Sequence, residues 1–62
     1  MRLTKEQIQR LRDMSPEGIY QSIRNLVREE HGVVDRDELS EALDDAIEAD
    51  LLEERQIRRF ED

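Results

Sequence analysis

The chain has 62 residues, with 17 acidic and 10 basic side chains, so its formal net charge at pH 7 is −7. This length limits it to one small domain, and the absence of cysteine excludes disulfide bonds and cysteine-ligated zinc. No apolar run approaches the roughly 20 residues that a membrane span needs, and no signal-peptide pattern follows Met1, so we expect a cytoplasmic protein without membrane contact.

Local capping chemistry predicts two helices in the first half of the chain, over residues 4–13 and 16–31. Thr4 and Gln7 form a capping-box pattern, in which each side chain accepts a hydrogen bond from the other residue's backbone N–H. Ser15 is a stronger start, because it is followed by a proline that loses no hydrogen bond at the first helical position. The second helix has one apolar face, formed by Ile19, Ile23, Leu26 and Val27.

A third helix is predicted over residues 35–50. Gly32 suits the left-handed C-cap of the helix before it. Asp35 and Glu38 then repeat the capping-box pattern. Apolar residues follow at i, i+3, i+4, i+7 and i+8, the clearest helical spacing in the chain: Leu39, Ala42, Leu43, Ala46 and Ile47.

The end of this helix is not fixed by local chemistry, because neither glycine nor proline follows residue 33. Leu51 and Leu52 either continue it or begin a fourth helix over residues 52–60. Adjacent leucines cannot share one narrow stripe, so we expect one of them to be exposed or to bury against a second chain. No segment shows the alternation of apolar and polar residues that is typical of a strand. The sequence therefore predicts an all-α fold, a compact bundle of three to four short helices. This bundle is expected to be a single domain over residues 1–62.

Charge is segregated along the chain. Residues 1–28 carry a net charge of +3, residues 29–54 carry −11 and residues 55–62 carry +1. The third helix places four carboxylates on the side away from its apolar stripe: Glu41, Asp44, Asp45 and Glu48. Like charges at i and i+4 cost a few tenths of a kcal/mol each, which a basic partner would relieve. The alternative interpretation is a solvated helix face.

One segment indicates another class of function. Between His31 and Leu39, a helix ends at glycine, a short apolar link follows, and a capped helix begins with a Glu-Leu pair. This pattern resembles the turn between the first two helices of winged-helix and helix-turn-helix regulators. The resemblance implies a basic recognition helix, for which the candidate nucleic-acid contacts are Arg55, Arg58 and Arg59. Because the segment after the turn is acidic and would be repelled by phosphates, nucleic acid is not the partner that we expect.

Residues suited to catalysis or ligand binding are scarce. The chain has one histidine and no cysteine, and no serine has the surroundings of a nucleophile elbow. The acidic run Asp35–Glu38 lacks the glycine and the distal glutamate of a calcium loop, and no glycine-rich phosphate loop is present. We therefore predict no catalytic residue, no metal, no cofactor and no enzymatic activity.

These patterns predict a small acidic protein-interaction module, an adaptor, regulator or inhibitor subunit that binds another macromolecule. The expected partner is a protein with a basic surface or a second copy of the chain. A helix-turn-helix-like nucleic-acid-binding regulator is the alternative. Besides the four carboxylates, we expect contacts from Leu52, Phe60 and Tyr20, the last at an interface rim or at the edge of the core. A domain this small is expected to be marginally stable unless a partner adds burial.

Overall fold

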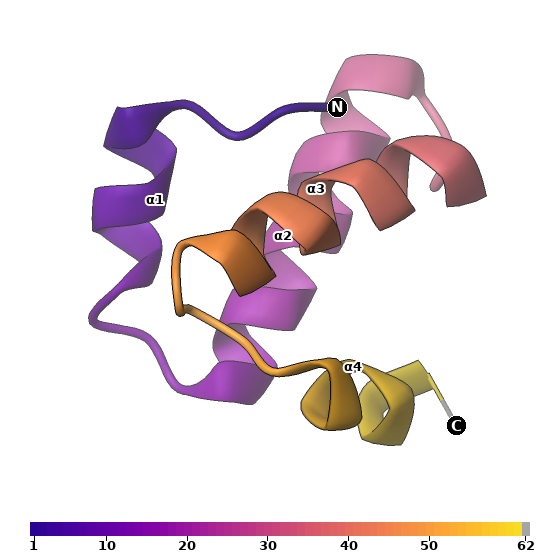
Figure 1. Cartoon of the computed structure of the whole chain (residues 1–62). Helices are drawn as coiled ribbons and strands as arrows, with labels where there is room; N and C mark the ends of the chain where they lie inside the picture. The colour runs from indigo at the N-terminus through magenta and orange to yellow at the C-terminus, as the bar shows by residue number, and fades with distance from the viewer. Residues whose placement is uncertain (62) are drawn as a thin grey trace.

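The computed structural model describes residues 1–61, which form four helices and no strand (Figure 1). The helices are α1 (Lys5–Leu11), α2 (Pro16–His31), α3 (Arg36–Glu48) and α4 (Glu54–Glu61). The predicted all-α bundle is confirmed. Asp62, which the predicted domain includes, lies outside the described residues. Within residues 1–61, no helix has the length and apolarity needed to cross a membrane.

The predicted caps of α1 and α2 are present. The Thr4 hydroxyl accepts a hydrogen bond from the Gln7 N–H at 3.1 Å, and the Gln7 side chain accepts one from the Thr4 N–H at 2.9 Å. The Ser15 hydroxyl accepts one from the Gly18 N–H at 3.2 Å. At the other end of α2, Gly32 is left-handed, with φ of 78°. These local signals therefore determine both ends of α2.

At the start of α3, only half of the predicted capping box forms. The Asp35 carboxylate accepts hydrogen bonds from the N–H groups of Asp37 at 2.9 Å and of Glu38 at 3.3 Å. The N–H of Asp35 itself donates to the Val33 carbonyl at 3.1 Å. The Glu38 carboxylate turns instead to the α-amino group of Met1. A hydrogen bond between two charged groups is stronger than one to an exposed backbone amide, which explains the difference from the sequence pattern.

A Schellman motif ends α3 at Glu48. The Leu51 N–H donates to the Ala46 carbonyl at 2.9 Å, and the Asp50 N–H donates to the Ile47 carbonyl at 3.1 Å. Asp50 takes the left-handed position, with φ of 62°. Aspartate is one of the few residues besides glycine that this conformation tolerates. The chain thus begins a fourth helix, and the third helix ends two residues earlier than predicted.

Replacing Asp50 with glycine is expected to stabilise the fold. Glycine adopts the left-handed conformation without strain, and the change removes a negative charge from the C-terminus of α3, where the helix dipole is also negative. We expect the free energy of unfolding to rise by about 1 kcal/mol, which corresponds to a Tm increase of roughly 4–8 °C. Thermal and urea unfolding followed by circular dichroism measure the change.

The matched control is Asp50→Ala, which removes the same charge and keeps a Cβ atom. Because the Cβ atom retains the strain, the alanine variant is expected to be less stable than the glycine variant. Equal stability of the two variants would contradict a strained left-handed turn at Asp50.

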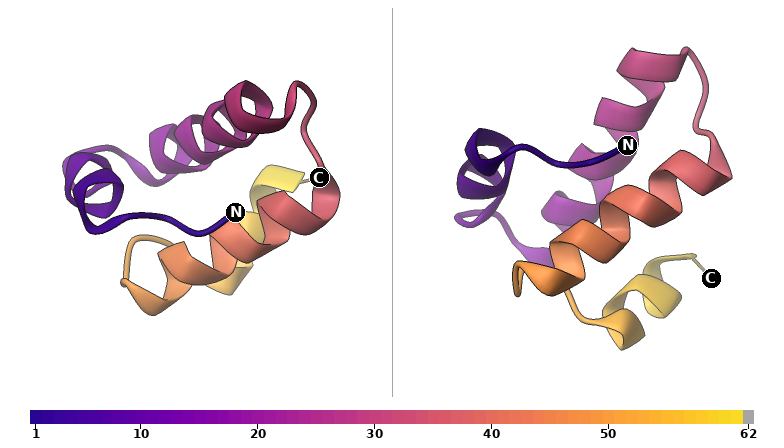
Figure 2. Two further views of the ribbon diagram at one scale, coloured as in Figure 1. Left: turned by 90° about the horizontal axis from the view of Figure 1, so that it is seen from above. Right: turned by 45° about the horizontal axis from the view of Figure 1, so that its top comes forward.

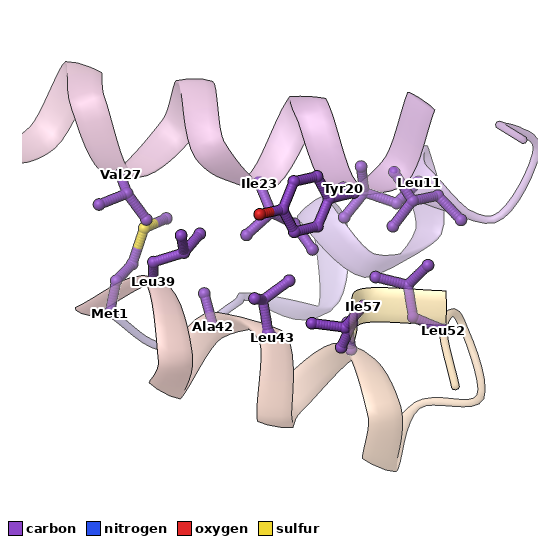
Figure 3. Packing of buried hydrophobic residues seen from close by; sticks show 12 residues of the cluster. Met1, Leu11, Tyr20, Ile23, Val27, Leu39, Ala42, Leu43, Leu52 and Ile57 are labelled. Carbon is purple, nitrogen blue, oxygen red and sulfur yellow. The ribbon is translucent and has the colours of Figure 1, made fainter. Parts of the chain in front are cut away.

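The hydrophobic core lies between α2 and α3, and α1, α4 and the N-terminal arm (residues 1–4) close it (Figures 1 and 3). The arm crosses from α1 to α3 (Figure 2). Ile23 and Val27 of α2 are fully buried, as are the small side chains Ala42 and Ala46 of α3. The other buried apolar residues are Met1, Leu11, Ile19, Tyr20, Leu39, Leu43, Leu52 and Ile57.

The expectation for the adjacent leucines was wrong. Leu52 is 3% exposed and belongs to the core, and Leu51 is partly buried against the same core. The expectation assumed one continuous helix, on which neighbouring side chains point about 100° apart. The left-handed turn at Asp50 breaks that geometry, so both leucines reach the interior. Leu52 is therefore a core residue and is not available to a partner on the surface.

Candidate functional site

One row of carboxylates runs along the exposed face of α3. The row, here called the α3 acidic row, consists of Asp37, Glu41, Asp44 and Glu48, all of them exposed. Their spacing of i, i+4, i+7 and i+11 places them within about 60° around the helix. The structure thus brings three of the predicted site residues together. The sequence interpretation missed Asp37, which continuing the four-residue spacing back from Glu41 would have found.

Asp45, the fourth predicted carboxylate, is not part of this row. Its side chain is only 13% exposed and accepts a hydrogen bond from the Leu3 N–H at 3.0 Å. The Arg2 guanidinium lies 3.4 Å from the same carboxylate. The prediction placed Asp45 on the same side of the helix as Asp44, but consecutive side chains on a helix point about 100° apart. Asp45 therefore holds the N-terminal arm against α3 and is not free for a partner.

The N-terminal amine lies close to two carboxylates of α3. It donates a hydrogen bond to the Glu38 carboxylate, lies 3.3 Å from the Glu38 carbonyl oxygen and lies 3.6 Å from Glu41 Oε1. His31 Nε2 lies 3.5 Å from the same Glu38 carboxylate. The hydrogen bond to Glu38 raises the pKa of the Met1 α-amino group above its ordinary value of 8.0, with burial acting in the opposite direction. The Met1 side chain packs near Val27 and Leu39 (Figure 3).

Stability is expected to fall as the pH rises past the ordinary pKa of 8.0, because the folded-state pKa of the Met1 amine exceeds the unfolded value. The amine is fully charged in both states below its unfolded pKa, where its contribution to stability is complete. Above that pH the unfolded chain loses the proton first, and the contribution disappears as the pH passes the folded pKa. Urea unfolding of the 62-residue chain at several pH values measures this slope.

Acetylation of the Met1 amine and the Glu38→Gln substitution serve as controls for this pH effect. The acetylated chain should show no amine-dependent slope, and the Glu38→Gln chain should show a smaller one, because the hydrogen-bonded carboxylate is the largest cause of the raised pKa. The same slope in the free and the acetylated chains would contradict the prediction.

Most of the α3 acidic row lacks a counter-charge. Glu41 approaches the N-terminal amine, but among residues 1–61 no basic nitrogen lies within ion-pair distance of Asp37, Asp44 or Glu48. Each of these three has a like-charged neighbour in the row three or four residues away, an unfavourable arrangement on a helix. The row thus carries repulsion that a cationic surface would relieve.

An open groove of about 920 Å³ adjoins the row between α3 and α4. Its lining comes mainly from α2, α3 and α4, and α2 packs against both of the other two helices. The contact between α4 and α2 includes Phe60 and Tyr20, whose ring centroids are 5.3 Å apart with an interplanar angle of 42°. Among the residues that line the groove, seven are apolar: Tyr20, Val34, Leu39, Leu43, Ile47, Ile57 and Phe60.

The structure places the two predicted aromatic contacts differently. Tyr20 is 3% exposed and belongs to the core, so of its two predicted places, an interface rim and the edge of the core, the interface rim is wrong. Its ring contacts that of Phe60, and the Arg24 guanidinium lies 5.9 Å from the ring centroid. Phe60 is only partly buried and lines the groove, where a partner has access to it.

The alternative nucleic-acid contacts lie on α4. Arg55, Arg58 and Arg59 are all exposed. Arg55 Nε lies 3.0 Å from the Glu53 carboxylate, and Arg58 lies 3.4 Å from the Glu54 carboxylate. These acidic neighbours reduce the positive potential that phosphates would meet. Binding of nucleic acid by these arginines stays a prediction.

Within the described part of the chain, no three histidine, aspartate or glutamate side chains are placed to hold a metal ion. No protein-family model matches the sequence, and the comparisons with curated proteins and with solved structures found no match either. The α3 acidic row and the adjoining groove are therefore the features on which a functional proposal rests.

Proposed function

We propose that the chain is a protein-interaction module that acts by binding a basic protein surface through the α3 acidic row. The observation that carries the proposal is the lack of counter-charge around Asp37, Asp44 and Glu48, together with the partly exposed apolar side chains of the groove beside them. Interfaces commonly combine an apolar centre with a charged rim, and complementary charge accelerates association.

The small size of the domain also favours a binding partner. A domain of this size buries only about 60% of the surface that its unfolded chain exposes, so added burial has a large relative effect on its stability. Binding of a basic partner would add apolar burial and reduce the repulsion within the row. The expected molecular role is that of an adaptor, regulator or inhibitor subunit.

The test compares two variants with the same net charge. The first carries Asp37→Asn, Asp44→Asn and Glu48→Gln. The second removes three exposed carboxylates outside α3, through Asp13→Asn, Glu29→Gln and Glu30→Gln. Asp45 and Glu38 are left unchanged in both, because they hold the N-terminal arm. Each immobilised chain is incubated with cell lysate, and the proteins retained at low and at high salt are compared with those retained by the unchanged chain.

The unchanged chain and the second variant are expected to retain the same protein in a salt-sensitive manner, and the α3 variant is expected to lose it. Retention of that protein by all three chains would show that the row is not the contact surface. Loss from both variants would show that net charge alone attracts the protein. A dimer in light scattering that the α3 variant abolishes would assign the row to a second copy.

A further inference from the structure

We infer that the groove between α3 and α4 binds an amphipathic helix of another protein, with lysine or arginine on both sides of an apolar stripe. This inference rests on the proposed function and specifies the form of the partner. It follows from three properties of the groove, namely its partly exposed apolar side chains, its two acidic rims and the helices that form its walls.

The apolar centre of the groove is available for contact. Val34, Ile47 and Phe60 are only partly buried, although each of them packs against the core. They belong to the segment before α3, to the end of α3 and to α4, so they are spread along the groove. An apolar stripe laid over them would complete their burial in the way that neighbouring helices do elsewhere in the bundle.

The secondary structure of the walls favours a helix over an extended peptide. An extended peptide binds most strongly by pairing its backbone with an exposed strand edge, and residues 1–61 contain no strand. Two helices on either side of an apolar floor match the helix-in-groove mode of recognition, in which anchors recur at i, i+3, i+4 and i+7. The eleven residues from Asp37 to Ile47 span about 15 Å, which corresponds to about three turns of a bound helix.

Charge complementarity identifies the residues that flank the stripe. Asp37 and Asp44 lie on the α3 rim of the groove, and Glu54 and Glu61 lie on the α4 rim. Two arginines, Arg24 and Arg36, are the basic residues among the lining side chains, so carboxylates outnumber them on the described surface. Because the Glu54 carboxylate already lies 3.4 Å from Arg58, a bound helix meets the carboxylates of Asp37 and Asp44 on the α3 side and chiefly that of Glu61 on the α4 side. Basic residues flanking its stripe would be attracted, and acidic ones would be repelled.

The experiment uses a fluorescein-labelled peptide amide of about 14 residues, a length of nearly four helical turns. Its leucines follow the i, i+3, i+4, i+7 spacing, lysines flank them, and alanine fills the other positions. A scrambled peptide of the same composition lacks the stripe, and a third peptide replaces the lysines with glutamates. Fluorescence anisotropy measures binding to the intact chain, and circular dichroism measures helix formation.

Three variants of the chain locate the binding surface. Ile47→Ala removes an apolar contact within the groove, and Asp44→Lys reverses a charge on its rim. Met14→Ala is the matched control, because Met14 is an exposed apolar side chain outside the groove, at 44% exposure. Urea unfolding of each variant confirms that the chain remains folded before binding is compared.

The lysine peptide is expected to bind with gain of helix, and binding should weaken about tenfold or more in the Ile47→Ala and Asp44→Lys chains but not in the Met14→Ala chain. Equal binding of the scrambled peptide, or equal binding by the Ile47→Ala chain, would overturn the inference. Displacement of the peptide by a DNA duplex, or occupation of the groove in a dimer that Ile47→Ala dissociates, would assign the groove to another occupant.

The outcomes separate this inference from the proposed function. If the peptide does not bind while the α3 variant still loses its protein from lysate, the inference about the groove fails and the proposed function stands. If the α3 variant retains that protein, the proposed function itself fails.

Discussion

Replacing Ile23 with alanine is expected to leave most of the chain unfolded at 25 °C. Ile23 has no exposed surface and lies at the centre of the contact between α2 and α3 (Figure 3). Truncation of a buried isoleucine to alanine costs about 2–5 kcal/mol, because the transfer free energy is lost and a cavity remains. A domain of this size without disulfide or metal rarely has more than about 3–5 kcal/mol of stability to lose.

Far-ultraviolet circular dichroism of the Ile23→Ala chain measures this loss directly. Ile23→Val removes a single methylene and is expected to cost about 0.5–1.5 kcal/mol, which leaves a folded chain for comparison. Val33→Ala is the surface control, because Val33 is 65% exposed and its truncation should change stability by less than about 0.5 kcal/mol. A urea midpoint of Ile23→Ala equal to that of the unchanged chain would contradict this description of the core.

Replacing Ala42 with leucine is expected to destabilise the fold by about 1–3 kcal/mol, through overpacking and not through a cavity. Ala42 has no exposed surface and lies on α3 where that helix faces α2. Its small side chain allows the two helices to approach, and close-packed interiors leave no room for three more carbon atoms. The larger side chain would force α2 and α3 apart or push neighbouring residues from their preferred rotamers.

Gln21→Leu is the matched control for this substitution. It places the same leucine side chain on the exposed face of α2 and is expected to change the free energy of unfolding by less than about 0.5 kcal/mol. Urea unfolding of the two variants gives the comparison. If Ala42→Leu were as stable as Gln21→Leu, α2 and α3 would not be closely packed at this position.

The sequence alone predicted the helices wherever short-range chemistry determines them. Thr4, Ser15 and Asp35 begin their helices as the capping patterns indicated, and Gly32 ends α2. The apolar stripes of α2 and α3 were recognisable for the same reason, because a helical period appears within a few residues. Three carboxylates of the α3 acidic row also followed from that period.

The features that the sequence did not predict depend on residues far apart in the chain. The Glu38 carboxylate accepts a hydrogen bond from the amine of Met1, 37 residues away, and does not complete its capping box. The Asp45 carboxylate accepts one from the N–H of Leu3, 42 residues away. The left-handed turn at Asp50 directs Leu51 and Leu52 toward a core that the other helices form. Burial of these two leucines offsets the strain of the turn. The same packing, with both α3 and α4 against α2, produced the groove. Local spacing in the sequence determined which residues share a helix face. Which helix packs against each face was decided only by the tertiary structure, because burial depends on contacts between distant segments.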